Sequence, residues 1–112
     1  MSGISTHVLD MALGKPAAGV RIRLDLSIGE NWEPFASGIT DLDGRCSQLV
    51  PSASVESGKY RITFDTGMYF GEQGKLTLYP EVVVIFLVTA DTGNYHIPLL
   101  LSPFGFTTYR GS

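Results

Sequence analysis

Hydrophobic and polar residues alternate strictly along two stretches of the chain. In the first stretch the apolar residues stand at every even position: Val20, Ile22, Leu24, Leu26 and Ile28. In the second, which follows a Ser57-Gly58 turn signal, they are Tyr60, Ile62 and Phe64. A period of two is typical of a β-strand with one buried face and one solvent face. The pattern predicts two half-exposed strands.

The segments between these two strands, and the one after them, show turn and helix signals in place of simple alternation. Residues 32–40 and 45–50 flank Asp41-Leu42-Asp43-Gly44, whose Asp and Gly residues suit a tight reversal, so a hairpin-like pair is expected there. The stretch from Asp65 to Gly74 breaks the alternation and predicts a short helix of about two turns.

The last forty residues are apolar on more than one face. Every residue from Val82 to Val88 is apolar, so both faces of this strand, or its edge, need cover. In the next strand, parity assigns Tyr95, Ile97, Leu99 and Leu101 to one face and His96, Pro98 and Leu100 to the other. A second subunit is the simplest cover for such surfaces.

Short strands with frequent turn signals define the fold class. About eight strands, with no crossover of helical length, predict an all-β protein built as an antiparallel two-sheet sandwich. No internal repeat or linker divides the chain, so residues 1–112 are expected to form a single domain.

Composition narrows the choice of partners. Apolar residues make up 44% of the chain, which is enough for a packed core. A net charge of −3 with only 8 Lys plus Arg argues against a nucleic-acid partner. The longest apolar run is too short for a membrane helix, and no signal segment is recognisable, so a cytoplasmic protein is expected.

Cys46 is the only cysteine. A single cysteine excludes an internal disulfide and a cysteine-based zinc site, and it is consistent with a reducing compartment. As a catalytic nucleophile it would need a basic partner, and no His stands beside it in the sequence. A half-buried strand residue is the favoured interpretation.

Two histidines are candidates for proton transfer near neutral pH: His7 in an early strand and His96 in a late one. A lone strand histidine is more often a hydrogen-bonded structural residue. His96 departs from that expectation because its face is opposite Tyr95, Ile97 and Leu99, so the imidazole should point away from the core.

Two further groups extend the candidate site. Arg45 follows a tight turn, where it could meet an anionic or carbonyl-rich ligand or form a surface ion pair with Asp41 or Asp43. The chain ends in Tyr109, Arg110, Gly111 and Ser112, which form either a frayed tail or a packed strand with a defined set of polar groups.

Familiar catalytic motifs do not occur. The sequence has no His-Glu-x-x-His spacing, no Gly-rich phosphate loop and no Gly-x-Ser-x-Gly elbow, so no metal, nucleotide or other cofactor is expected. A metal held by histidines across an oligomer interface is a weaker alternative.

Four of these segments together resemble the transthyretin-like 5-hydroxyisourate hydrolases. The matching motifs are Thr6-His7-Val8-Leu9-Asp10, Thr40 to Arg45, Tyr95 to Pro103, and the ending Tyr109-Arg110-Gly111-Ser112. The last of these resembles the tetrapeptide that separates the hydrolases from the carrier transthyretin. The resemblance runs from about Ile4 to the last residue.

The resemblance implies a transthyretin-like (prealbumin-like) sandwich of two four-stranded antiparallel sheets, with one short helix near residues 66 to 74. It also implies a homotetramer whose central channel carries the active sites. The implied substrate is 5-hydroxyisourate, opened to 2-oxo-4-hydroxy-4-carboxy-5-ureidoimidazoline in urate degradation.

The resemblance assigns catalysis to His7, Arg45 and His96 and substrate binding to Tyr109, Arg110, Gly111 and Ser112. One imidazole would activate water, and Arg45 would stabilise the oxyanion or hold ring oxygens. Which histidine is the base stays open, as does a covalent role for Ser112. The alternatives are a non-catalytic carrier of a small aromatic ligand and a structural β-sandwich module.

Overall fold

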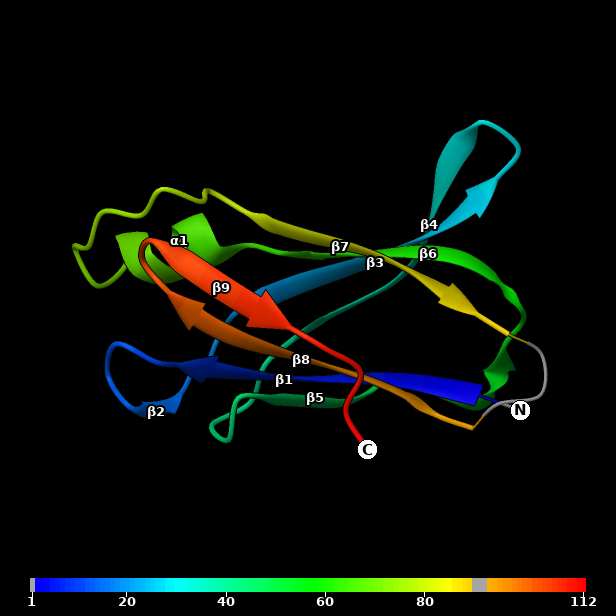
Figure 1. Cartoon of the computed structure of the whole chain (residues 1–112), viewed down its shortest axis with the longest axis horizontal. Coiled ribbons are helices and arrows are strands. Elements are labelled where there is room, and N and C mark those ends of the chain that lie inside the picture. The colour runs from blue at the N-terminus through cyan, green and yellow to red at the C-terminus, as the bar shows by residue number, and fades with distance from the viewer. Residues whose placement is uncertain (1, 90–92) are drawn as a thin grey trace.

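Two β-sheets pack face to face in the computed structural model, which describes residues 2–89 and 93–112 (Figure 1). The first sheet contains β1 (Ser2–Asp10), β2 (Lys15–Pro16), β5 (Arg45–Val55), β8 (Tyr95–Ser102) and β9 (Gly105–Thr108). The second contains β3 (Arg21–Ile28), β4 (Asn31–Ile39), β6 (Gly58–Phe64) and β7 (Val82–Val88), in the order β4-β3-β6-β7. The predicted two-sheet sandwich is confirmed.

The first sheet is not wholly antiparallel, and it has five strands when the two-residue β2 is included. Strand β1 pairs with β8 in parallel, whereas β5 and β2 pair with β1 in the antiparallel sense. The expectation of purely antiparallel sheets was wrong here. All strands of the second sheet lie between β1 and β8 in the sequence. This long connection lets β8 run parallel to β1, whereas a hairpin can only join antiparallel strands.

The expected hairpin between residues 32–40 and 45–50 was also wrong. Strand β4 pairs with β3 through a tight turn in which Ile28 faces Asn31, and Gly29 has a φ of +62°. The Asp41–Gly44 reversal does form, but it carries the chain from one sheet to the other, where β5 pairs with β1. β4 pairs with β3 because only Gly29 and Glu30 connect the two strands, which is the length of a tight β-hairpin loop.

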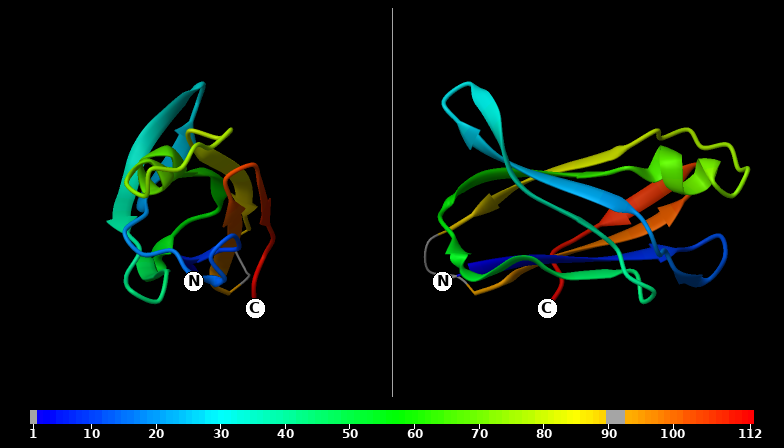
Figure 2. Two further views of the ribbon diagram at one scale, coloured as in Figure 1. Left: turned by 90° about the vertical axis from the view of Figure 1, so that its left-hand side faces the viewer. Right: turned by 180° about the vertical axis from the view of Figure 1, so that it is seen from behind.

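The predicted strand faces are confirmed in the core. Ile22, Leu24, Ile62 and Phe64 are buried between the sheets, as are the four residues that parity assigned to the inner face of β8. Ile28 is an exception and is 55% exposed. It lies beyond the last β3–β6 pair, in the β3–β4 hairpin that projects from the sandwich (Figure 2).

Strand β7 is a sheet edge with an exposed apolar face. Its outward residues Val83, Ile85 and Leu87 are accessible, while Val82 and Val88 are buried. As expected from the sequence, this strand has an apolar face that the single chain leaves uncovered. No helix in the described part of the chain has the length and apolar character needed to cross a membrane.

The short helix α1 (Thr66–Gly71) is confirmed and is tied to the first sheet by one hydrogen bond. The Tyr69 hydroxyl donates to Oδ2 of the fully buried Asp10 at 2.7 Å, and Asp10 Oδ1 accepts from the backbone of Ala12 and Leu13 at 3.0 Å. Burial, reinforced by the bond to Asp10, raises the pKa of Tyr69 to about 12. The phenol therefore stays a donor throughout the physiological range.

Removal of this hydroxyl should destabilise the protein. We expect Tyr69→Phe to lower the free energy of unfolding by about 1.5–3 kcal/mol, because the buried carboxylate loses one charge-assisted hydrogen bond. Urea denaturation at a fixed protein concentration measures the difference. Tyr79→Phe is the matched control, because the Tyr79 hydroxyl has no hydrogen-bond partner among the described residues. Equal stability of the two variants would contradict the role of Tyr69.

Candidate active site

Pairing along both edges of β1 brings the three predicted catalytic residues onto one face of the first sheet. In the parallel pair, Ser5 lies opposite His96, and in the antiparallel pair, His7 lies opposite Arg45. Opposite residues in a sheet share a face, and the alternate β1 residues, Ile4 and Val8 among them, point into the core. Ser5, His7, Arg45 and His96 therefore share the outer face.

A tight turn fixes the positions of Arg45 and His7. Asp41 Oδ1 accepts hydrogen bonds from the backbone of Asp43 at 2.9 Å and of Arg45 at 3.0 Å. Gly44 adopts a φ of +75°, and its carbonyl accepts from Val8 at 2.7 Å; a side chain there would overlap with the Val8 carbonyl oxygen. The turn thus sets the start of β5 against β1.

The same turn determines which nitrogen of His7 carries a proton. His7 Nε2 lies 2.9 Å from the carbonyl oxygen of Asp43. Since a carbonyl only accepts hydrogen bonds, Nε2 is the donor, and neutral His7 has its lone pair on Nδ1.

His96 is held by Ser5 and lies near His7 and Arg45. Its Nδ1 lies 2.9 Å from the Ser5 hydroxyl. Burial lowers the pKa of His96, and the nearby His7 and Arg45 lower it further because they repel a second positive charge. The imidazole is therefore kept neutral near pH 7, the form that accepts a proton.

The C-terminal tail is packed in place. Gly111 donates its backbone N–H to the His96 carbonyl at 2.8 Å and forms an antiparallel bridge with His96. The Arg110 guanidinium lies 4.2 Å above the Tyr95 ring, a cation–π contact, and Arg110 Nη2 donates to the Asn94 carbonyl at 3.4 Å. These contacts hold the end of the chain against β8, beside His96.

An open depression of about 480 Å³ lies where these groups meet. Its lining is mostly polar and comprises Ser5, Thr6, Arg45, Ser47, Asn94, His96 and Ser112. His7 is on the same face but does not line this depression in the single chain. The volume is in the range of small-molecule sites.

Four residues that line the polar depression were not predicted from the sequence: Ser5, Thr6, Ser47 and Asn94. Strand parity carried the signal for two of them, because Ser5 stands two residues before His7 and Ser47 two residues after Arg45. Each therefore shares the outer face with its charged neighbour. Asn94 precedes β8 directly and had no such signal.

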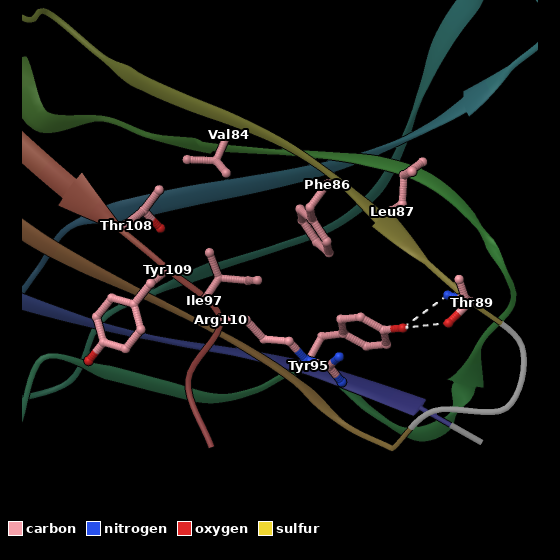
Figure 3. A pocket seen from close by; sticks show the side chains of 9 residues that line it. All are labelled: Val84, Phe86, Leu87, Thr89, Tyr95, Ile97, Thr108, Tyr109 and Arg110. Atoms are coloured by element: carbon pink, nitrogen blue, oxygen red, sulfur yellow. Dashed lines mark hydrogen bonds between the residues drawn. The ribbon is translucent and has the colours of Figure 1, made fainter.

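Tyr109 and Arg110 line a second, more apolar cleft of about 350 Å³ rather than the polar depression. This cleft lies between β7 on one side and the start of β8, the end of β9 and the C-terminal tail on the other, and Figure 3 shows Arg110 over the Tyr95 ring. The Tyr95 hydroxyl accepts a hydrogen bond from the backbone of Thr89 at 2.9 Å. Of the ending, only Ser112 lines the polar depression itself, while Gly111 packs on His96.

Cys46 pairs with Thr6 on the opposite face of the sheet, away from the polar depression. Its thiol is half buried, and burial raises its pKa, with a smaller contribution from the charge of Asp41. A protonated, inward-facing thiol favours the strand-residue interpretation over that of a nucleophile. Within residues 2–89 and 93–112, no group of three or more His, Cys, Asp or Glu side chains could hold a metal ion.

The site combines a neutral imidazole, a second imidazole with a fixed proton, a guanidinium and a terminal serine on a β-sandwich. Such groups can bind a small, carbonyl-rich ring and assist attack by water. Fold and lining together define the class as a transthyretin-type sandwich with a polar depression of small-molecule size.

The chain belongs to the HIUase/Transthyretin family, whose model matches residues 4–111. It is 43% identical over 113 residues to the mouse 5-hydroxyisourate hydrolase, covering 99% of this chain and 96% of the relative. The solved 5-hydroxyisourate hydrolase of Klebsiella pneumoniae superposes with a TM-score of 0.89 at 34% identity over 100% of both chains.

Sea bream transthyretin in complex with thyroxine superposes equally well, with a TM-score of 0.93 at 30% identity over 97% of this chain and 94% of that one. The fold is thus common to the hydrolase and the hormone carrier. The choice between the two activities rests on the side chains of the site.

The pKa of His96 should depend on Arg45. We expect His96 to titrate below the ordinary value of 6.5, and Arg45→Ala to move its pKa upward, because one repelling positive charge is removed. An NMR titration of the imidazole measures both values. Arg23→Ala, which removes a cation from the outer face of the other sheet, should change nothing. An unaltered His96 pKa in Arg45→Ala would contradict the described proximity.

Proposed function

We propose that this protein is a hydrolase that opens 5-hydroxyisourate to 2-oxo-4-hydroxy-4-carboxy-5-ureidoimidazoline in urate degradation. One observation carries the proposal: His7, Arg45 and His96 come from three strands onto one sheet face, and the chain end brings Ser112 into the depression that Arg45 and His96 line. Relatives in its family are named for this activity.

His96 acts as the general base. Its lowered pKa keeps the imidazole neutral at pH 7, so it can take a proton from water as the oxygen attacks the ring carbonyl. The tetrahedral intermediate then collapses, the carbonyl C–N bond breaks, and the protonated imidazole returns a proton to the leaving ring nitrogen. The ring opens, and the new carboxylic acid releases its proton to water to give a carboxylate.

Arg45 stabilises the charge that develops on the carbonyl oxygen. A guanidinium stays protonated at any relevant pH, and its start-of-strand position is fixed by the Asp41 carboxylate through the backbone. The Asp43 carbonyl holds the proton of His7 on Nε2, so His7 orients water or substrate through Nδ1.

The C-terminal residues bind the substrate. Ser112 lines the depression and makes no hydrogen bond with either histidine in the described part of the chain, which favours a binding role over that of a nucleophile. Gly111 holds the tail against His96. Arg110 anchors the tail through its contact with the Tyr95 ring, and Tyr109 and Arg110 would reach the substrate from the neighbouring apolar cleft.

The working form is a homotetramer of single-domain chains, located in the cytoplasm. The apolar outer face of β7 and the open polar depression are both surfaces that a neighbouring subunit can cover. Cover over the depression would exclude bulk water and strengthen the charge interactions within it.

A non-catalytic carrier of a small aromatic ligand is the alternative. The fold likeness to transthyretin supports it. The polar lining argues against it, because imidazole and guanidinium suit a carbonyl-rich ring better than an apolar aromatic one.

The purified protein should accelerate the loss of ultraviolet-absorbing hydroxyisourate when urate is oxidised in situ by urate oxidase. His96→Ala should reduce kcat by roughly 10²-fold or more, because the base is lost. Circular dichroism and light scattering should show an unchanged fold and assembly. Near-normal turnover in this variant would contradict the base assignment, and no acceleration by the unmodified protein would favour the carrier.

A further inference from the structure

Two residues hold the imidazole of His96 from two sides: Ser5, which has no role in the proposed reaction so far, and Gly111, which has been assigned only to the tail. On one side, Nδ1 lies 2.9 Å from the Ser5 hydroxyl, directly across the β1–β8 pair. On the other, Gly111 lies against the ring: a Cβ added at Gly111 would come 2.6 Å from His96 Cδ2 and 3.3 Å from Cγ. Nε2 is the ring nitrogen left without a hydrogen bond among the described residues.

We propose that Ser5 and Gly111 are positioning residues that fix the tautomer and the ring orientation of His96, so that Nε2 carries the lone pair and faces the substrate. The inference rests on the proposed function, in which His96 is the general base. Neither residue needs to touch the substrate in order to act in this way.

The tautomer follows from the role of the base. If Nε2 is to accept a proton from water, the proton of the neutral imidazole must sit on Nδ1, and Ser5 Oγ is the acceptor placed to hold it there. A hydroxyl is neutral, so it orients the ring without adding the negative charge that would raise the pKa of His96. Ser5 thereby leaves the imidazole neutral and correctly protonated.

Gly111 supplies the steric half of the arrangement. The tail must approach His96 closely enough for the Gly111 N–H to reach the His96 carbonyl at 2.8 Å. A side chain at this position would also meet Pro98 Cγ at 3.1 Å, so either the ring or the tail would have to move. Because Ser112 follows directly, the same contact sets the distance between the base and the chain end.

The hydroxyl is tested with Ser5→Ala, the conservative variant Ser5→Thr and the control Ser37→Ala, an exposed serine on the other sheet. Nitrogen-15 NMR of His96 should show the Nδ1–H tautomer in the unmodified protein, loss of this preference in Ser5→Ala, and its return in Ser5→Thr. In parallel, kcat should fall about tenfold in Ser5→Ala with little change in KM, the effect of one neutral hydrogen bond.

The steric half is tested with Gly111→Ala and the control Gly105→Ala. A Cβ at Gly105 would meet only Ser102 Oγ, at an ordinary 3.8 Å, so this variant should behave as the unmodified protein. Gly111→Ala should shift the His96 ring resonances and lower kcat. Unchanged resonances and turnover would overturn the role of Gly111.

An Nε2–H tautomer in the unmodified protein, or an unchanged tautomer or kcat in Ser5→Ala, would overturn the role of Ser5. Failure of the proposed function is distinguishable. If the unmodified protein does not hydrolyse hydroxyisourate, the hydrolase assignment fails, while the NMR comparison still decides whether Ser5 and Gly111 fix the imidazole.

Discussion

The site depends on one constraint, the register of β1 between its two neighbours. β1 pairs in parallel with β8 and antiparallel with β5, and each pairing sets one polar residue of β1 opposite one partner. A slip by a single residue would turn Ser5 and His7 into the core and bring Ile4 to the surface. Burial of the apolar residues of β1 therefore fixes the register, and the register assembles the site.

The electrostatics of the site follow from this assembly. The imidazole of His96 is half buried and lies beside a guanidinium and a second histidine. These surroundings lower its pKa below that of a free histidine and favour the neutral form. The turn that presents Arg45 also fixes the proton of His7, and the strand pair that presents His96 also supplies Ser5. The turn and the strand pair that hold the fold together thus also position the side chains of the candidate site.

Local sequence patterns predicted much of the fold and the residues of the candidate site. Alternation assigned the inner faces of β3 and β6 correctly except at Ile28, and strand parity assigned that of β8, because burial of one sheet face acts on each residue separately. The sites of His7, Arg45 and His96 came from short motifs. The parallel β1–β8 pair, the transfer of β5 to the first sheet and the stacking of Arg110 on Tyr95 were not predicted, because each depends on segments far apart in the chain and has no local signal.

The most direct test of the central claim is a structure of the protein with bound urate, which shares the purine ring system of the substrate but is not hydrolysed. We predict that urate occupies the outer face of the first sheet, with ring oxygens on Arg45 and a ring edge at His96 Nε2. Urate bound instead in the apolar cleft beside β7, or on the second sheet, would contradict the account.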